Sequence, residues 1–239
     1  MEAIAPMSLL EARAVEKRYG GVVALAGCSV VIERPGIYGL IGPNGAGKTT
    51  LFDVITGATL PDAGSVGIEG RDITGLAPYR LKSIGVSRTF QECRVFPQFT
   101  CLENLLFALQ LHGGGKAKEA HRMLELVNLH GSAHEPASSL SFGQRRLLEI
   151  VGTFIVQPKF LLLDEPASGV NPVLLETLAD FLRTMYRERP GVFLIVEHNM
   201  QFIMQLANEL IVMHQGVVLD RGAPAAIQAS PRVIEAYLG

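Results

Sequence analysis

A glycine-rich turn between an apolar run and a predicted helix constrains the fold of this chain more than any other feature. The run is Ile37–Ile41, the helix begins at Lys48, and the turn reads Gly42-Pro43-Asn44-Gly45-Ala46-Gly47-Lys48-Thr49. Glycines let backbone N–H groups converge on one point without Cβ clashes, and the positive end of the following helix attracts anions. This pattern, in a strand–turn–helix context, predicts a cradle for the phosphates of a nucleotide.

Each part of the turn has an expected role. The backbone amides would hold the β-phosphate, Lys48 would reach the β- and γ-phosphates, and the Thr49 hydroxyl would ligate Mg²⁺. A chance glycine-rich turn is the alternative, but the strand and helix on the correct sides favour the cradle. The residues predicted to bind ATP here are Gly42, Pro43, Asn44, Gly45, Ala46, Gly47, Lys48, Thr49 and Thr50.

Two adjacent carboxylates follow a second apolar run. Asp164 and Glu165 come directly after Phe160–Leu163. Ligands of open α/β sheets bind at the carboxyl ends of the strands. Asp164 is therefore predicted to hold Mg²⁺, through water, and Glu165 to orient and deprotonate the attacking water as general base. A solvated strand end is the alternative, and the phosphate cradle upstream makes it the weaker one.

Two further polar residues are candidates for the same site. His198 follows the apolar run Val192–Val196 and is predicted to hydrogen-bond the γ-phosphate and to sense its loss, although a lone histidine in such a place is usually a surface residue. Gln91 lies between the α/β part and a helical part of the chain. A neutral amide there is predicted to touch the metal and the water, but Gln91 alone carries no such information.

The hydrophobic pattern predicts an α/β fold with an inserted helical lobe. Unbroken apolar runs are typical of parallel strands that are covered on both faces. Alternating, turn-rich segments before residue 41 and up to Asp72 predict several short strands. Apolar residues recur at helical spacing in 102–111, 117–129 and 143–156. We expect a single domain, 1–239, with an α/β core at about 1–90 and 156–239 and a helical subdomain at about 91–155.

Composition excludes several classes of protein. The 239 residues are 48% hydrophobic, and the formal net charge of −2 gives no overall attraction for nucleic acid. The three cysteines form no C-x-x-C pair, so neither a zinc knuckle nor a disulfide framework is expected. No basic segment precedes an apolar stretch at the start, and no apolar run approaches the roughly 20 residues of a spanning helix. We therefore expect a cytoplasmic protein without a signal peptide.

With Leu140-Ser141-Phe142-Gly143-Gln144, placed after Gln91 and before Asp164, these motifs resemble the ABC ATPase family over essentially the whole chain. The resemblance implies a P-loop NTPase core, RecA-like with a mainly parallel sheet, an antiparallel β subdomain and an inserted α-helical subdomain. It implies that Ser141, Gly143 and Gln144 contact ATP bound by a second ABC ATPase subunit, which suits a helix N-terminus. A simple helix cap is the alternative.

The resemblance assigns two further segments. Tyr19 is similar to the aromatic residue that stacks on adenine in the family, with a core tyrosine as the alternative, and Ser168–Asn171 resembles the loop that crosses the dimer interface. Phe96, Phe99 and Leu102 would line a groove that receives a short helix of the membrane subunit, unless they are simply core. Phe142 and Asn171 replace the commoner glycine and aspartate.

Within the family, the chain is most similar to the ATP-binding subunits of branched-chain amino-acid uptake systems. The segments that carry this are 19–22, 85–91, 102–106, 196–200 and 236–239. The implied partners are transmembrane permease subunits and, indirectly, a periplasmic or extracellular solute-binding protein, with the chain peripheral on the cytoplasmic face of the membrane. Urea or short-amide uptake subunits and lipopolysaccharide-export ATPases share many of these segments. Soluble ABC ATPases of DNA repair or translation carry inserted coiled coils, zinc loops or a second such domain, none of which is present here.

Overall fold

The computed structural model describes residues 8–89, 94–111, 114 and 117–238. Its central sheet has the strand order β10-β9-β3-β8-β7-β6, and only β10 runs antiparallel to its neighbour. The sheet strands are β3 (Gly36–Ile41), β6 (Val86–Arg88), β7 (Phe160–Asp164), β8 (Val192–Val196), β9 (Glu209–His214) and β10 (Val217–Gly222). The predicted parallel strands are therefore confirmed.

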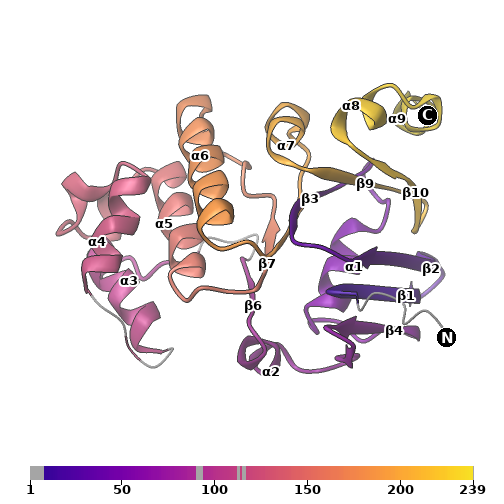
Figure 1. Ribbon diagram of the computed structural model, residues 1–239, viewed down its shortest axis with the longest axis horizontal. Helices are drawn as coiled ribbons and strands as arrows, with labels where there is room; N and C mark the ends of the chain where they lie inside the picture. The colour runs from indigo at the N-terminus through magenta and orange to yellow at the C-terminus, as the bar shows by residue number, and fades with distance from the viewer. Residues whose placement is uncertain (1–7, 90–93, 112–113, 115–116, 239) are drawn as a thin grey trace, which may run out of the picture.

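A second, antiparallel sheet lies beside the first, with the order β2-β1-β4-β5 (Figure 1). Its strands are β1 (Leu10–Tyr19), β2 (Val22–Ile32), β4 (Ala63–Ile68) and β5 (Arg71–Asp72). The prediction of several short strands before residue 41 is wrong, because β1 and β2 span 10 and 11 residues. Register shifts between β1 and β2 interrupt the alternation of apolar and polar residues, and Ala14 of β1 has a φ of 45°. The sequence of one long hairpin therefore has the pattern of several shorter strands.

The helices α3, α4 and α5, which come between β6 and β7 in the chain, lie in the range predicted for the lobe. In the described residues the helices are α1 (Lys48–Ile55), α2 (Pro78–Ser83), α3 (Cys101–Gln110), α4 (Ala117–Leu126), α5 (Phe142–Phe154), α6 (Pro172–Glu188), α7 (Met200–Leu206), α8 (Pro224–Gln228) and α9 (Pro231–Leu238). Asn171 caps α6 by accepting a hydrogen bond from the Leu174 N–H at 3.0 Å. α4 ends before the predicted Leu129, where Asn128 takes a left-handed φ of 58°. The limits of the lobe as a separate subdomain stay a prediction.

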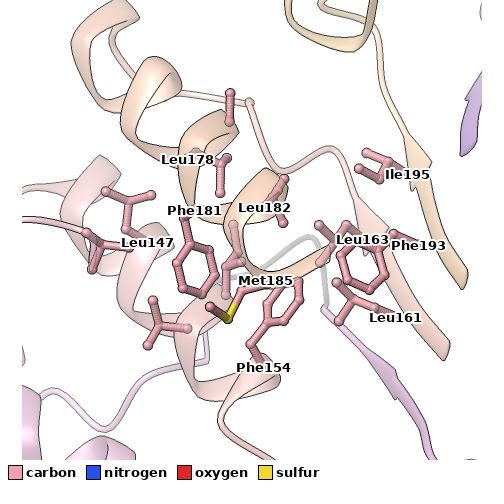
Figure 2. Close-up of a cluster of buried hydrophobic side chains, with 14 of the residues drawn as sticks. Leu147, Phe154, Leu161, Leu163, Leu178, Phe181, Leu182, Met185, Phe193 and Ile195 are labelled. Atoms are coloured by element: carbon pink, nitrogen blue, oxygen red, sulfur yellow. The ribbon is translucent and has the colours of Figure 1, made fainter. Parts of the chain in front are cut away.

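Strands β7 and β8 are buried on both faces, which explains their unbroken apolar sequences. Alternate side chains enter two different cores: Leu161 and Phe193 pack with α5 and α6, whereas Phe160 and Leu194 pack with α1 and the antiparallel sheet. Figure 2 shows the first core, where the Phe154 ring meets two other aromatic rings edge to face. α1 is thus held between the two sheets (Figure 1).

The register of the parallel strands aligns their carboxyl ends. Leu40 of β3 and Asp164 of β7 both pair with Val196 of β8. The residues that follow these three positions therefore emerge at one edge of the sheet. Among the described residues, no helix has the length and apolarity that crossing a bilayer requires.

We expect Phe154→Ala to lower the free energy of unfolding by about 3–5 kcal/mol, because it removes a buried ring and leaves a cavity. Phe154 is 5% exposed, and its ring centroid lies 5.1 Å from that of Phe181 and 5.2 Å from that of Phe193. Urea unfolding followed by circular dichroism measures the effect. Val173→Ala, at a residue that is 73% exposed on α6, should change the stability by no more than about 0.5 kcal/mol. Equal effects of the two substitutions would contradict the packing described.

Candidate active site

The glycine-rich turn lies between β3 and α1 and is shaped by close backbone approaches. Gly47 has a φ of 98°, and a Cβ there would lie 2.4 Å from the carbonyl oxygen of Ala24. A Cβ on Gly42 would lie 2.2 Å from the Met213 carbonyl oxygen. Both positions therefore require glycine. The Gly216 N–H donates to the Ala46 carbonyl at 3.0 Å, which ties the turn to the β9–β10 hairpin.

The mouth of the turn is open for a ligand. Asn44, Gly45 and Thr49 are exposed, and no side chain caps the first turn of α1. The N–H groups at this helix start are therefore available to an anion.

Lys48 is buried within the turn. Its Nζ donates to the carbonyl oxygens of Gly42 at 2.8 Å and Pro43 at 3.0 Å. Burial lowers the pKa of this ammonium group, and the negative charge of Glu165 opposes that effect. The side chain is thus held against its own loop, close enough to Glu165 to feel its charge.

Asp164 ends β7 with a carboxylate that is 2% exposed. Its Oδ1 is buried and accepts no hydrogen bond from the described residues. Burial, followed by the neighbouring charge of Glu165, raises the pKa of this carboxyl above its ordinary value. An oxygen of this kind is suited to a cation, because a positive ligand would offset both effects.

Glu165 and His198 meet across the ends of β7 and β8. The Oε1 of Glu165 lies 3.0 Å from the Nε2 of His198, and both side chains are partly exposed. Glu165 has a φ of 45°, an uncommon value for a residue other than glycine, and its N–H donates to the Val196 carbonyl at 2.9 Å. The structure therefore brings Lys48, Asp164, Glu165 and His198 to one edge of the sheet. Gln91 lies outside the described residues.

The segment Leu140–Gln144 forms the start of α5, away from the glycine-rich turn. Ser141 caps α5 in a capping box: its N–H donates to the Gln144 Oε1 at 3.0 Å, and its hydroxyl accepts from the Gln144 N–H at 3.4 Å. A Cβ on Gly143 would lie 2.8 Å from the Leu174 side chain. The strands β6 and β7 separate α5 from α1 in Figure 1. Ser141, Gly143 and Gln144 are therefore not grouped with the cradle of their own chain.

Tyr19 is exposed, so the alternative of a core tyrosine is wrong. Tyr19 is the last residue of β1, and 50% of its surface is exposed. The Lys17 Nζ lies 5.6 Å from the centroid of its ring. An exposed ring in this position is open to a stacking partner.

Sequence reasoning missed two buried charged groups that border the site. Arg146 of α5 pairs with Glu149 at 2.7 Å and donates to the Asp164 carbonyl oxygen at 2.6 Å. Glu197, directly before His198, is 3% exposed and accepts hydrogen bonds from backbone N–H groups. The signal available for Glu197 was an acid that follows an unbroken apolar strand, as Asp164 does.

The ABC transporter family profile matches residues 25–168, and the profile of the branched-chain amino acid ATP-binding cassette transporter matches residues 221–239. The chain belongs to the ABC transporter ATP-binding family. As an ABC ATPase, it binds ATP and hydrolyses it to energise a transporter.

This ABC ATPase is similar to named transporter subunits along almost its whole length. It is 36% identical to the high-affinity branched-chain amino acid transport ATP-binding protein BraF of Pseudomonas aeruginosa, over 97% of this chain and 98% of that protein. It is 35% identical to the probable branched-chain amino acid transport ATP-binding protein LivG of Archaeoglobus fulgidus, over 98% and 96% of the two chains.

A solved structure confirms the predicted fold. The ADP conformation of MJ1267, an ATP-binding cassette of an ABC transporter, matches with a TM-score of 0.85 and 31% identity over 98% of this chain and 99% of that one. A nucleotide-free ATP-binding cassette matches with a TM-score of 0.83 and 30% identity over 98% and 100%. The family predicted from the motifs is therefore confirmed.

We expect Gly47→Ala to weaken ATP binding about fivefold or more. The substitution places a Cβ 2.4 Å from the Ala24 carbonyl oxygen at a φ of 98°, and strain of about 1–3 kcal/mol in the bound state corresponds to a loss of affinity of about 5- to 150-fold. Titration of a fluorescent ATP analogue measures the affinity. Gly27→Ala is the matched control, because its φ is 80° but a Cβ there meets nothing within 4 Å. Unchanged affinity of Gly47→Ala would show that the turn does not need its observed shape.

Proposed function

We propose that this ABC ATPase drives the import of branched-chain amino acids, or of related amino acids or amides, by hydrolysing ATP with Lys48, Glu165 and His198. The hydrolysis rests on one observation: these side chains and Asp164 converge at one sheet edge, with Glu165 3.0 Å from His198. The substrate class is supported by the matching segment 221–239 and by the names of the relatives.

Hydrolysis of a phosphoanhydride depends mainly on positioning and on stabilising charge. In the proposed site, the cradle amides and Lys48 hold the β- and γ-phosphates. Glu165 accepts the proton of the attacking water, and His198 exchanges its contact with Glu165 for one with the γ-phosphate. Gln91 would touch the same water. Tyr19 stacks on the adenine.

The residues at the site fit Mg²⁺. Asp164 offers a buried carboxylate oxygen without a partner in the described residues, and Thr49 offers an exposed hydroxyl on the first turn of α1. Oxygen ligands of this kind suit a hard divalent cation, and Gln91 would supply a third. When bound, the metal neutralises part of the charge on the phosphate oxygens.

A second ABC ATPase subunit completes the site in this proposal. Ser141 is exposed at the start of α5, and the helix dipole there favours a negative ligand. Because α5 lies apart from α1 in the same chain (Figure 1), its N-terminus would serve the γ-phosphate of ATP bound by the other subunit. The loop 168–171 would cross between the subunits. ATP then holds two chains together, and hydrolysis releases them.

A groove beside the helical lobe is the proposed contact with a permease subunit. It has a volume of about 420 Å³, and Phe96 and Phe107 line it together with Leu111. Of the three residues expected to line it, only Phe96, which is 47% exposed, does so. Phe99 is 38% exposed but is not among the lining residues, and Leu102 is half-buried and packs against the core. An apolar, partly exposed groove suits the apolar face of a short helix. The chain would thereby lie on the cytoplasmic face of the membrane, bound to permease subunits. A solute-binding protein would deliver the solute to these permease subunits.

Glu165→Gln should keep ATP binding, reduce turnover about 10²- to 10⁴-fold and accumulate an ATP-bound dimer. The amide cannot take the proton from water, but it keeps the size of the side chain. Phosphate release and size-exclusion chromatography with ATP measure the two effects. Glu125→Gln, on the exposed face of α4, is the control and should behave as the wild-type chain. Normal hydrolysis by Glu165→Gln would remove this residue from the proposed role.

Ser141→Arg should abolish hydrolysis by the pure variant while leaving ATP binding to the cradle intact. A mixture with wild-type chain should retain intermediate activity, since mixed dimers keep one complete site. Thr100→Arg is the matched control: Thr100 caps α3 in the same type of capping box, so both variants lose a cap worth about 0.5–2 kcal/mol. Full activity of pure Ser141→Arg would contradict a site shared between two chains.

A further inference from the structure

Glu197 holds two loops of the site with a single carboxylate. Its Oε1 accepts a hydrogen bond from the Ala167 N–H at 2.7 Å. Its Oε2 accepts from the N–H groups of His198 at 2.9 Å and Asn199 at 2.8 Å. Burial raises the pKa of this carboxyl, and the three backbone hydrogen bonds oppose that effect. Hydrogen bonds to a charged acceptor are stronger than those between neutral groups.

The two loops connect to different parts of the site. One leads from β8 through His198 into α7, and His198 contacts Glu165 at 3.0 Å. The other leads from Glu165 through Ala167 into α6, and it contains the segment 168–171 that is proposed to cross to the second subunit. Glu197 therefore lies between the hydrolytic pair and the proposed dimer contact.

The second loop also supports the start of α5. Gly169 has a φ of 70°, and a Cβ there would lie 2.7 Å from the Phe142 ring. A Cβ on Gly143 would meet Leu174 at 2.8 Å and the Val170 Cα at 3.7 Å. The helix start that would serve the ATP of the other subunit thus rests on the same loop that Glu197 holds.

We propose that Glu197 is a positioning residue that couples the two ATP sites of the dimer, because it fixes His198 to the loop on which the start of α5 rests. The inference depends on the proposed function and adds to it a residue and a path of contacts. When ATP bound by the other subunit contacts the start of α5, this helix start shifts, and the loop 167–171 shifts with it. The Glu197 carboxylate, which is bonded to this loop, then moves His198.

The start of α7 would not by itself require this residue. Asn199 already caps α7 by accepting from the Phe202 N–H at 3.0 Å. Burial of a charge is unfavourable unless several hydrogen bonds satisfy it. The Oε1 of Glu197 accepts from Ala167 in the other loop, and this hydrogen bond does not stabilise the start of α7.

Glu197→Gln is the decisive variant, since it keeps the shape and loses acceptor capacity. In either orientation its NH₂ group would face at least one backbone N–H, so at least one of the three hydrogen bonds is lost. We expect kcat to fall about 10- to 100-fold from the misplacement of His198, with the affinity for ATP changed by less than about threefold. Glu209→Gln, which removes the charge from a peripheral pair with Arg221, is the matched control.

A double-mutant cycle separates positioning from general damage. If Glu197 acts through His198, Glu197→Gln should add less than about threefold to the loss of kcat in His198→Ala. Fully additive losses would overturn the proposal. His198→Ala with normal kcat would instead contradict the proposed role of His198. Should Glu197→Gln not fold, Glu197→Asp carries the same test, because the shorter side chain cannot reach Ala167 and His198 together.

The coupling to the second subunit has its own measurement. In the Glu165→Gln background, Glu197→Gln should speed dissociation of the ATP-bound dimer about fivefold or more, measured by dilution and size-exclusion chromatography. An unchanged lifetime would overturn the coupling. Failure of Glu165→Gln alone to form a dimer would instead count against the proposed shared site.

Discussion

The parallel register of β3, β7 and β8 is the constraint on which the rest of this structure depends. Leu40 and Asp164 pair with the same residue of β8, so three chain segments leave the sheet at one level. The phosphate turn, the acidic pair and the loop of His198 are then neighbours, although more than a hundred residues separate the first from the others. A shift of β7 by one residue would turn the Asp164 side chain to the other face of the sheet and move Glu165 away from His198.

Backbone hydrogen bonds and close approaches make the site rigid before any nucleotide arrives. Glycines at positions 42 and 47 allow carbonyl oxygens of neighbouring strands to touch the turn. Lys48 is held by two carbonyls of its own loop, and Glu197 by three amides of two loops. Asp164 keeps one oxygen without a partner in the described residues. Lys48 would exchange these carbonyls for phosphate oxygens, but the preorganised backbone loses little free energy to rearrangement when the site binds a phosphate and a cation.

The helical lobe and the sheet edge are joined by charged groups as well as by apolar packing. Arg146, 2% exposed on α5, reaches the carbonyl oxygen of Asp164 and pairs with Glu149. The start of the same helix rests on the loop after Glu165. A movement of α5 therefore has two routes to the hydrolytic residues, one through Arg146 and one through Ala167. Two such sets of contacts suit a transporter ATPase in which ATP occupancy is linked to a rigid-body movement.

The sequence by itself determined the family, the parallel strands and the location of the phosphate turn, because each depends on local patterns: glycines at fixed spacing and unbroken apolar runs. It also placed Glu165 and His198 at strand ends. Only the tertiary structure decided that β1 and β2 form one long bulged hairpin, that Tyr19 is exposed, and that Glu197 and Arg146 are buried against the site. These features depend on partners far away in the chain, and an isolated glutamate or arginine carries no local signal of which backbone amides or carbonyls will surround it.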